Sequence, residues 1–196
     1  MTKTVAANPK TLSDKEIIRQ IVEEKKTLLF GELYDRYANK IYRKCISMVK
    51  NKEDARDLCH DVIVKAFLNI ATFAGRSSFS TWVYMITYNQ CIDFLRNKQK
   101  KRVVEFESEY DVIESDENTV IEEKKIFEIE VERLDELMHR LSETDRAILL
   151  MKYQDEMSIE EIEEALTLKN SAVKMRLMRA RDRLRKIYLK TYGKRQ

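Results

Sequence analysis

The sequence has very little glycine and proline, with three glycines and one proline among 196 residues. Tight turns and β-hairpins depend heavily on these two residue types, so a fold of many short strands is disfavoured. Apolar residues make up 43% of the chain and charged residues 36%, which suits amphipathic helices joined by short polar loops. The composition therefore predicts an all-α protein.

Cysteine and histidine are also sparse. Cys45, Cys59 and Cys91 are odd in number and widely spaced, without a C-x-x-C pair, so a disulfide framework is improbable and a reducing compartment is expected. Cys59 and His60 are adjacent, and the only other histidine is the distant His139, which is the wrong spacing for a zinc site. We expect no metal and no other cofactor.

The sequence lacks the motifs of most enzymes and membrane proteins. It has neither G-x-x-x-x-G-K-[ST] nor G-x-G-x-x-G, and its carboxylates are not accompanied by a nucleophile or histidine in a catalytic pattern. No apolar run approaches the ~20 residues of a membrane span, and the first residues contain no apolar segment typical of a signal peptide. We expect a cytoplasmic protein that is not an enzyme, binds no small-molecule substrate and does not insert into a membrane.

The modest net charge of +3 hides a strong segregation of charge. Residues 103–136 contain fourteen acidic and three basic residues, whereas residues 169–196 contain eleven basic residues and only one acidic residue, Asp182. A second basic run, residues 96–102, directly precedes the acidic stretch. Two basic zones separated by an acidic spacer indicate two binding sites for a polyanion.

Apolar periodicity and capping residues divide the chain into two helical modules. Helices are expected over residues 14–50, 51–73 and 80–101, and then at 134–141, from Ser142, over 158–166 and over 171–186. The predicted organisation is a first domain at 13–101, an acidic flexible linker at 102–119 and a second domain at 120–190.

The second module contains a helix-turn-helix pattern. A short helix capped by Ser158 is followed by a turn and by a longer basic helix, the arrangement that places a recognition helix in the DNA major groove. The early residues of that helix would reach base edges and the later arginines would contact phosphates. The predicted DNA-binding residues are Ser171, Ala172, Lys174, Met175, Arg176, Arg179 and Arg181. A solvated basic helix without a DNA partner is the alternative.

The first module contains an aromatic and basic region around the loop at residues 74–78. Exposed rings can stack on unpaired bases while nearby cations hold the nucleic-acid backbone. Tyr84 and Tyr88 are expected to belong to the core, and Phe73 is the ring most expected to be exposed. The predicted nucleic-acid-binding residues here are Phe73, Arg76, Ser77, Trp82, Asn89 and Arg96.

A third pattern is acidic. Asp54, Asp57 and Asp61 are spaced three and four residues apart on one helix face. Asp54 suits the positive end of the helix dipole, but Asp61 lies well inside the helix, where a basic protein partner would explain it.

Together these segments resemble bacterial sigma factors of the extracytoplasmic-function (ECF) group, within the sigma-70 family. The resemblance covers about residues 26–101 and 134–187. It rests on residues 53–61 (EDARDLCHD), 79–96 (FSTWVYMITYNQCIDFLR), 141–142 (LS), 158–162 (SIEEI) and 172–181 (AVKMRLMRAR).

The resemblance implies a protein that binds core RNA polymerase and directs initiation at promoter DNA. Asp57, His60 and Asp61 match positions that contact the polymerase clamp, and Asp54 joins them on the same face. Phe73 matches a ring that caps a flipped-out base of the −10 element. By the same resemblance Asn89 contacts the −10 duplex, the helix beginning at Ser171 reads the −35 element, and the acidic linker enters the RNA exit path. An anti-sigma factor is the expected regulatory partner.

The chain differs from the family's usual residues at several motif positions. His60 and Asp61 stand where Gln-Glu is usual, and Thr87 and Tyr88 stand where Ala-Arg is usual. Glu163 replaces a small residue, and 171–172 replaces Gly-Thr. Two other interpretations remain open at this point: a helix-turn-helix regulator that works without polymerase, and a helical adaptor that binds only proteins.

Overall fold

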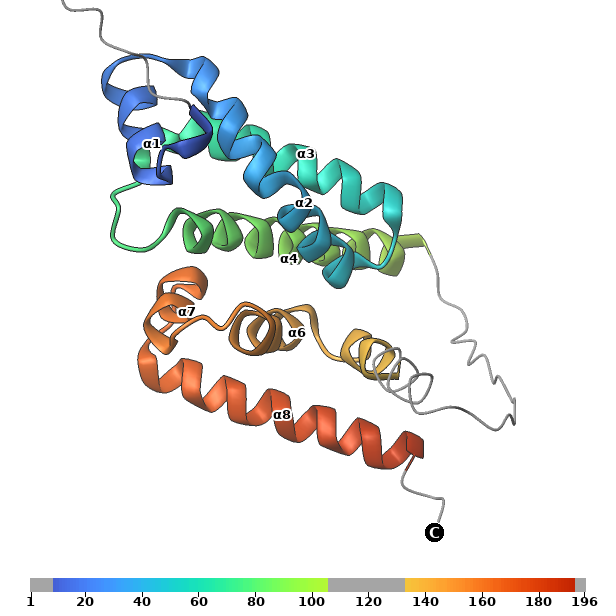
Figure 1. Ribbon diagram of the computed structural model, residues 1–196. Helices are drawn as coiled ribbons and strands as arrows, with labels where there is room; N and C mark the ends of the chain where they lie inside the picture. Colours follow the sequence, from blue (N-terminus) through green and yellow to red (C-terminus); the bar gives the residue numbers. More distant parts are fainter. Residues whose placement is uncertain (1–8, 106–132, 193–196) are drawn as a thin grey trace, which may run out of the picture.

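The structure is a computed structural model that describes residues 9–105 and 133–192. Helices account for nearly all of this part of the chain, and no strand occurs in it. The all-α prediction is confirmed. The helices form two layers, with α1 to α4 in one and α6 to α8 in the other, and the long helices α4 and α8 lie on either side of α6 and α7 (Figure 1).

The first module consists of α1 (Asp14–Glu23), α2 (Phe30–Val49), α3 (Lys52–Asn69) and α4 (Phe79–Glu105). Helices α2, α3 and α4 pack on one another around fully buried apolar side chains. Residues that recur every three or four positions form this core, as amphipathic helices require. They include Leu33, Ile41, Met48, Val62 and Val83.

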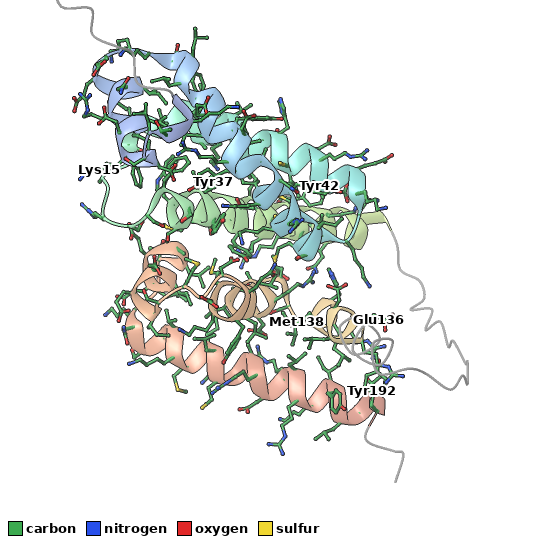
Figure 2. The ribbon with its side chains drawn as sticks, viewed as in Figure 1. Lys15, Tyr37, Tyr42, Glu136, Met138 and Tyr192 are labelled. Carbon is green, nitrogen blue, oxygen red and sulfur yellow. The ribbon has the colours of Figure 1, made fainter. Side chains whose placement is uncertain are left out.

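The prediction of one continuous helix over residues 14–50 is wrong. After α1 the backbone adopts a positive φ of 57° at Lys25 and passes through the 3-10 turn η2 (Thr27–Leu29) before α2 begins. The break folds α1 back onto α2. Arg36 on α2 forms an ion pair with Asp14 at 2.7 Å. The hydroxyl of Tyr37 donates to the same carboxylate (Tyr37 is labelled in Figure 2). Periodicity alone cannot show such a break because the apolar spacing is similar on both sides of it.

The second module contains a helical stretch at residues 133–139, α6 (Glu143–Leu149), a π-helical turn η4 (Leu150–Gln154), α7 (Ile159–Leu166) and α8 (Asn170–Tyr192). Leu137, Ile148, Met151, Ile162 and Val173 are almost completely buried and form its core. Capping side chains are present at the start of helices in both modules. The side chains of Ser13, Asn51, Ser142 and Ser158 accept hydrogen bonds from the first-turn backbone of α1, α3, α6 and α7, respectively.

The two modules are in direct contact. Helix α4 packs against α6 and α7, and α2 also contacts α6. The expected acidic linker lies mostly outside the described residues, which resume at residue 133.

Candidate nucleic-acid and polymerase interface

Helix α8 presents its cations to solvent because its apolar stripe is turned inward. Val173, Leu177 and Ala180 are buried against α6 and α7, at the spacing of one helix face. The other faces carry the predicted −35 residues: Ser171, Ala172, Lys174, Met175, Arg179 and Arg181 are exposed and Arg176 is half-buried. An open cavity of about 310 Å³ lies between the start of α6 and α8 and is lined by Arg176, Arg179 and Arg183. Arg176 and Arg179 can reach phosphate groups, whereas Arg183 forms an ion pair with Asp145 at the start of α6.

A tight turn sets the angle between α7 and α8. Ser158 and Glu161 form a reciprocal capping box at the start of α7, and Thr167 closes the helix in the left-handed region with φ 52° and ψ 45°. The Thr167 N–H bonds to the carbonyl oxygens of the preceding turn, which terminates α7 three residues before α8 begins. This is the helix-turn-helix arrangement that the sequence predicts.

The loop before α4 forms a small cavity with an aromatic wall. Phe73 lies 5.8 Å from Phe79 and 5.6 Å from Trp82, measured between ring centroids. The cavity, of about 220 Å³, is lined by Phe73, Arg76, Ser77 and Trp82 from the first module and by Glu164 from α7. A flat ring next to a cationic loop can receive an unpaired base.

The exposure of the aromatic residues differs in part from expectation. Phe73 is half-buried rather than the most exposed ring, because Phe79 and Trp82 pack against it. Tyr88 is fully buried, as expected, and Tyr84 is half-buried. Arg76 remains exposed at the loop tip, and Ser77 is half-buried.

The predicted DNA-binding residues along α4 face the second module. The Asn89 Nδ2 atom donates to the Ala165 carbonyl oxygen at 3.3 Å, although Asn89 is an exposed residue. Arg96 donates to Glu143 at 3.2 Å and to Thr144 at 3.3 Å, both at the start of α6. The sequence patterns did not indicate that this face would be partly covered.

The acidic face of α3 points to solvent. Asp57, His60 and Asp61 are exposed and form no hydrogen bond or ion pair within the described part of the chain. Asp54 behaves differently, since its carboxylate pairs with the Lys98 ammonium at 2.7 Å. Three of the four residues predicted to bind polymerase therefore remain available to a partner.

Comparison with known proteins identifies the family. The model of sigma-70 region 2 matches residues 33–101, and that of sigma-70 region 4 matches residues 131–184. The ECF RNA polymerase sigma factor SigW of Bacillus subtilis (strain 168) is 32% identical over 165 residues, which cover 80% of this chain and 87% of SigW. The chain belongs to the ECF sigma factors. SigM of the same organism is 26% identical over 82% of this chain and 96% of its own length.

Two solved structures share the fold of this sigma factor. CnrH, in complex with the cytosolic domain of CnrY, aligns with a TM-score of 0.62 at 21% identity, covering 89% of this chain and 96% of CnrH. The sigma factor RpoE of Bartonella quintana, in complex with the anti-sigma factor NepR, aligns with a TM-score of 0.59 at 18% identity, covering 81% of this chain and 95% of RpoE.

A buried polar cluster joins the two modules of the sigma factor, and sequence reasoning missed it. Lys44 on α2 forms an ion pair with Asp155, and only 7% and 2% of the two side chains are exposed. The Tyr88 hydroxyl donates to the other Asp155 oxygen at 2.6 Å, and the Lys44 ammonium lies 3.9 Å from the centre of the Tyr84 ring. Burial, together with the neighbouring Asp155 charge, raises the pKa of Tyr88 well above its ordinary value.

A second buried contact lies beside the first. Arg146 on α6 donates to the Met48 carbonyl oxygen near the end of α2 and contacts His139 Nδ1 at 2.5 Å. Burial and the positive charge of Arg146 lower the pKa of His139 to about 4. Little in the sequence indicated that these charged groups are buried. Lysine is almost never fully buried unless it is paired, so Lys44, next to Cys45 of the apolar stripe, is expected at the solvent-exposed border of that stripe.

Within the described residues, no group of side chains is arranged to hold a metal ion. None of the helices in those residues is long and apolar enough to span a membrane.

Proposed function

We propose that this sigma factor contacts its partners through three separate surfaces, and that the division into a domain at 13–101, a linker at 102–119 and a domain at 120–190 follows these roles. As an ECF sigma factor the chain binds core RNA polymerase and directs initiation at promoter DNA. The acidic linker would enter the RNA exit path of the polymerase.

The −35 surface is the exposed side of α8. The observation that supports it best is the separation of the two helix faces: buried Val173 and Leu177 hold α8 against its own module, while its cations point outward. Residues near Ser171 would read base edges, and Arg176, Arg179 and Arg181 would bind phosphates. Phosphate contacts of this kind release counterions, so binding should weaken steeply with salt.

The −10 surface is the loop cavity with the adjoining face of α4. Phe73 and Trp82 supply rings for an unpaired base, and Arg76 and Ser77 supply polar groups for the strand. Asn89 and Arg96 extend this surface along α4, about two and four helical turns beyond Trp82 at about 3.6 residues per turn. In the structure both side chains bond only to residues of the second module, and they can exchange these contacts for contacts with DNA.

The polymerase surface is the acidic face of α3. Asp57 and Asp61 lie one helical turn apart with His60 between them, and all three are free to meet a basic partner. Asp54 would first have to release Lys98. Two carboxylates four residues apart on an exposed helix face repel each other and destabilise the helix slightly. Their presence at these positions therefore favours a role in binding a partner.

An anti-sigma factor is the proposed regulator. CnrH and RpoE, which share this fold, were solved as complexes with the CnrY cytosolic domain and with the anti-sigma factor NepR. The site of action would be the cytoplasm, and the protein would have no catalytic chemistry of its own.

In vitro transcription tests the proposed function directly. Purified chain and core polymerase are incubated with a fragmented genomic library, and transcript starts are mapped. We expect starts downstream of one shared pair of −10 and −35 sequences. A regulator that works without polymerase would not compete with another sigma factor for core enzyme in the same reactions.

The polymerase surface is tested by replacing Asp57 and Asp61 with Lys. Charge reversal should weaken binding to core polymerase by at least about 100-fold, as expected for like charges placed at a charged interface. Binding is measured by pull-down, and helical content by circular dichroism. The control replaces Asp35 and Glu156, which are exposed carboxylates outside α3, in the same way. Equal binding of the two double variants would contradict the assignment.

A further inference from the structure

Two methionines of α8 are exposed to solvent. Met175 is 45% exposed and Met178 is 42% exposed. The other methionines within residues 9–105 and 133–192 are buried or half-buried, namely Met48, Met85, Met138, Met151 and Met157. Met178 is not among the residues that the sequence predicts for the −35 element. Single exposed apolar residues are ordinary, but a pair of them on a surface proposed to bind DNA requires an explanation.

The two methionines lie on the side of α8 that faces away from its own module. At about 100° per residue, Met175 lies about 200° and Met178 about 140° around the helix from the buried Val173. Helix α8 is the outermost helix of the second layer, on the far side of α6 and α7 from α4 (Figure 1). If α8 enters a major groove, both side chains therefore point towards the edges of the base pairs.

Apolar and cationic groups lie next to each other on this surface. The cavity of about 310 Å³ between the start of α6 and α8 is lined by Leu168, Ala172 and Met175 as well as by Arg176 and Arg179. The two arginines suit phosphate groups, but the carbon atoms of the other three residues do not bind an anion. Phosphate binding alone therefore does not account for this lining, and the partner should also carry an apolar group.

Thymine supplies that combination in the major groove of DNA. Its 5-methyl group is the apolar group presented there, whereas the other positions on the base edges are hydrogen-bond donors and acceptors. The methionine side chain is unbranched and polarizable, so it can adapt to a methyl group. Residues 169–196 contain eleven basic residues and one acidic residue, which favours a polyanion over a protein as the partner of this face.

We propose that Met175 and Met178 bind the 5-methyl groups of thymine in the −35 element and thereby select A·T base pairs at the positions they contact. This inference rests on the −35 function proposed above for α8. Arg176 and Arg179 bind phosphates, which are the same for every base, so they do not contribute to this selection. The selection depends on the methyl group, and uracil, which lacks only that group, should bind more weakly.

The main test replaces thymine by uracil in the −35 element. The probe is a fluorescein-labelled promoter duplex, chosen from the mapped transcript starts, with 2′-deoxyuridine in place of every thymine of the −35 element on both strands. Binding of the full-length chain together with core polymerase is measured by fluorescence anisotropy. We expect the uracil duplex to bind about fourfold more weakly for each methyl group contacted, from the free energy of burying one such group. The same replacement in the spacer between the two elements should have no effect.

Alanine variants identify the side chains responsible. The double variant Met175→Ala and Met178→Ala should bind the thymine and uracil duplexes equally, because it has no apolar group left for the methyl. Leu189→Ala removes another exposed apolar side chain, further along α8, and should keep the wild-type ratio of the two affinities. Alanine is the best helix former and all three positions are exposed, so the variants should keep their helical content, which circular dichroism checks.

A second pair of variants separates apolar contact from side-chain length. Met175→Leu keeps an apolar side chain of similar volume and should keep most of the preference for thymine. Met175→Gln has a similar length but a polar end, which loses free energy when it is placed against a methyl group. It should therefore lose the part of the preference that Met175 contributes.

The outcomes separate this inference from the function on which it rests. Equal binding of the two duplexes by the wild-type chain overturns it, as does a preference for thymine that persists in the double methionine variant. Replacing Arg176 and Arg179 with Ala should weaken binding of both duplexes by the same factor, because uracil leaves the phosphates unchanged. Absence of any effect of the arginines would instead contradict the −35 assignment.

Two further results would also overturn the selection of thymine. One is a mapped −35 element without A·T base pairs. The other is a double methionine variant that binds core polymerase weakly but shows the wild-type ratio of affinities for the two duplexes, because the methionines would then contact a protein.

Discussion

The two surfaces proposed for DNA differ in what lies against them. The face of α4 and the face of α8 both carry polar and cationic residues next to a buried apolar stripe. The α4 face is engaged by α6 and α7, whereas Lys174, Arg179 and Arg181 on α8 are exposed. Charge pattern therefore indicates which face suits a polyanion, but it does not show whether that face is free.

The difference has a simple electrostatic origin. Within the second module, glutamates gather on α7, and α8 carries most of the cations. Since α7 packs against α4 and α8 does not, the module turns its acidic helix to the first module and its basic helix to solvent. This predicts that the two DNA surfaces respond differently to substitution.

The largest effect is expected on the free surface. Replacing Arg176 and Arg179 with Ala removes two phosphate-binding cations from α8 and should reduce −35-dependent initiation about 100-fold, at ~1.5–3 kcal/mol for each hydrogen bond to a charged group. In vitro transcription at several salt concentrations measures the loss, and the salt dependence should become shallower. Arg185→Ala, on an exposed residue further along α8, is the control. A similar loss in the control would mean that general charge, rather than position, determines binding.

On the covered surface, Phe73→Ala should act at the melting step. Loss of a ring that stacks on a base costs ~1–3 kcal/mol, so promoter opening should slow about tenfold while the closed complex forms within about twofold of normal. Permanganate footprinting follows opening, and gel-shift assays follow the closed complex. Phe67→Ala removes a partly exposed ring on α3 that pairs with Phe30, and it should leave both steps unchanged. Equal slowing of the two steps by Phe73→Ala would contradict the base-capping role.

The contact between the modules should make stability depend on pH through His139. Its pKa is about 4 in the folded chain against 6.5 ordinarily, so between these values the unfolded chain binds the additional proton. Stability should therefore fall as the pH drops from about 6.5 towards 4, by about 1–2 kcal/mol at pH 5. Urea unfolding at pH 7 and pH 5 measures the difference.

Two variants show whether His139 is the origin of that dependence. His139→Gln should remove most of the pH-dependent loss because glutamine does not titrate. His60→Gln changes the other histidine of the chain, which is exposed on α3, and should keep the wild-type dependence. If both variants lose stability equally on acidification, other groups are responsible.

The smallest effect is expected at the turn before α8. Thr167 is β-branched and has a φ of 52°, a conformation that costs most residues ~1–2 kcal/mol but glycine very little. Glycine removes this strain but also increases the conformational entropy of the unfolded chain, which offsets part of the gain. The net effect of Thr167→Gly should be a stabilisation of about 0.5–1 kcal/mol. Thermal unfolding measures the change. Lys169→Gly, at a neighbouring position without a positive φ, should destabilise it instead.

Local sequence features predicted most of the fold. Ser142 and Ser158 directly precede α6 and α7, and their side chains cap free backbone N–H groups of the first turn. The apolar stripe of α8 and its cationic faces also follow directly from residue spacing. Capping and amphipathic periodicity act over a few residues, so they can be read without knowing the tertiary structure.

Other features could not be predicted because they depend on residues far apart in the chain. The break at Lys25 is compensated by contacts of α1 with Arg36 and Tyr37. The burial of Phe73 depends on how the loop returns to Phe79 and Trp82. Neither arrangement leaves a periodic signal.

By itself, the sequence determined the helical class, the caps, the family and the residue types that suit DNA and polymerase, since each depends on spacing along one helix or one motif. Only the tertiary structure decided that Asp155 meets Lys44 and Tyr88, and that α7 lies over the α4 face. A charged side chain can be buried without a large cost only when an oppositely charged or hydrogen-bonding partner is buried beside it. Lys44 and Tyr88 both lie more than sixty residues from Asp155 in the sequence, so only the tertiary fold brings them together.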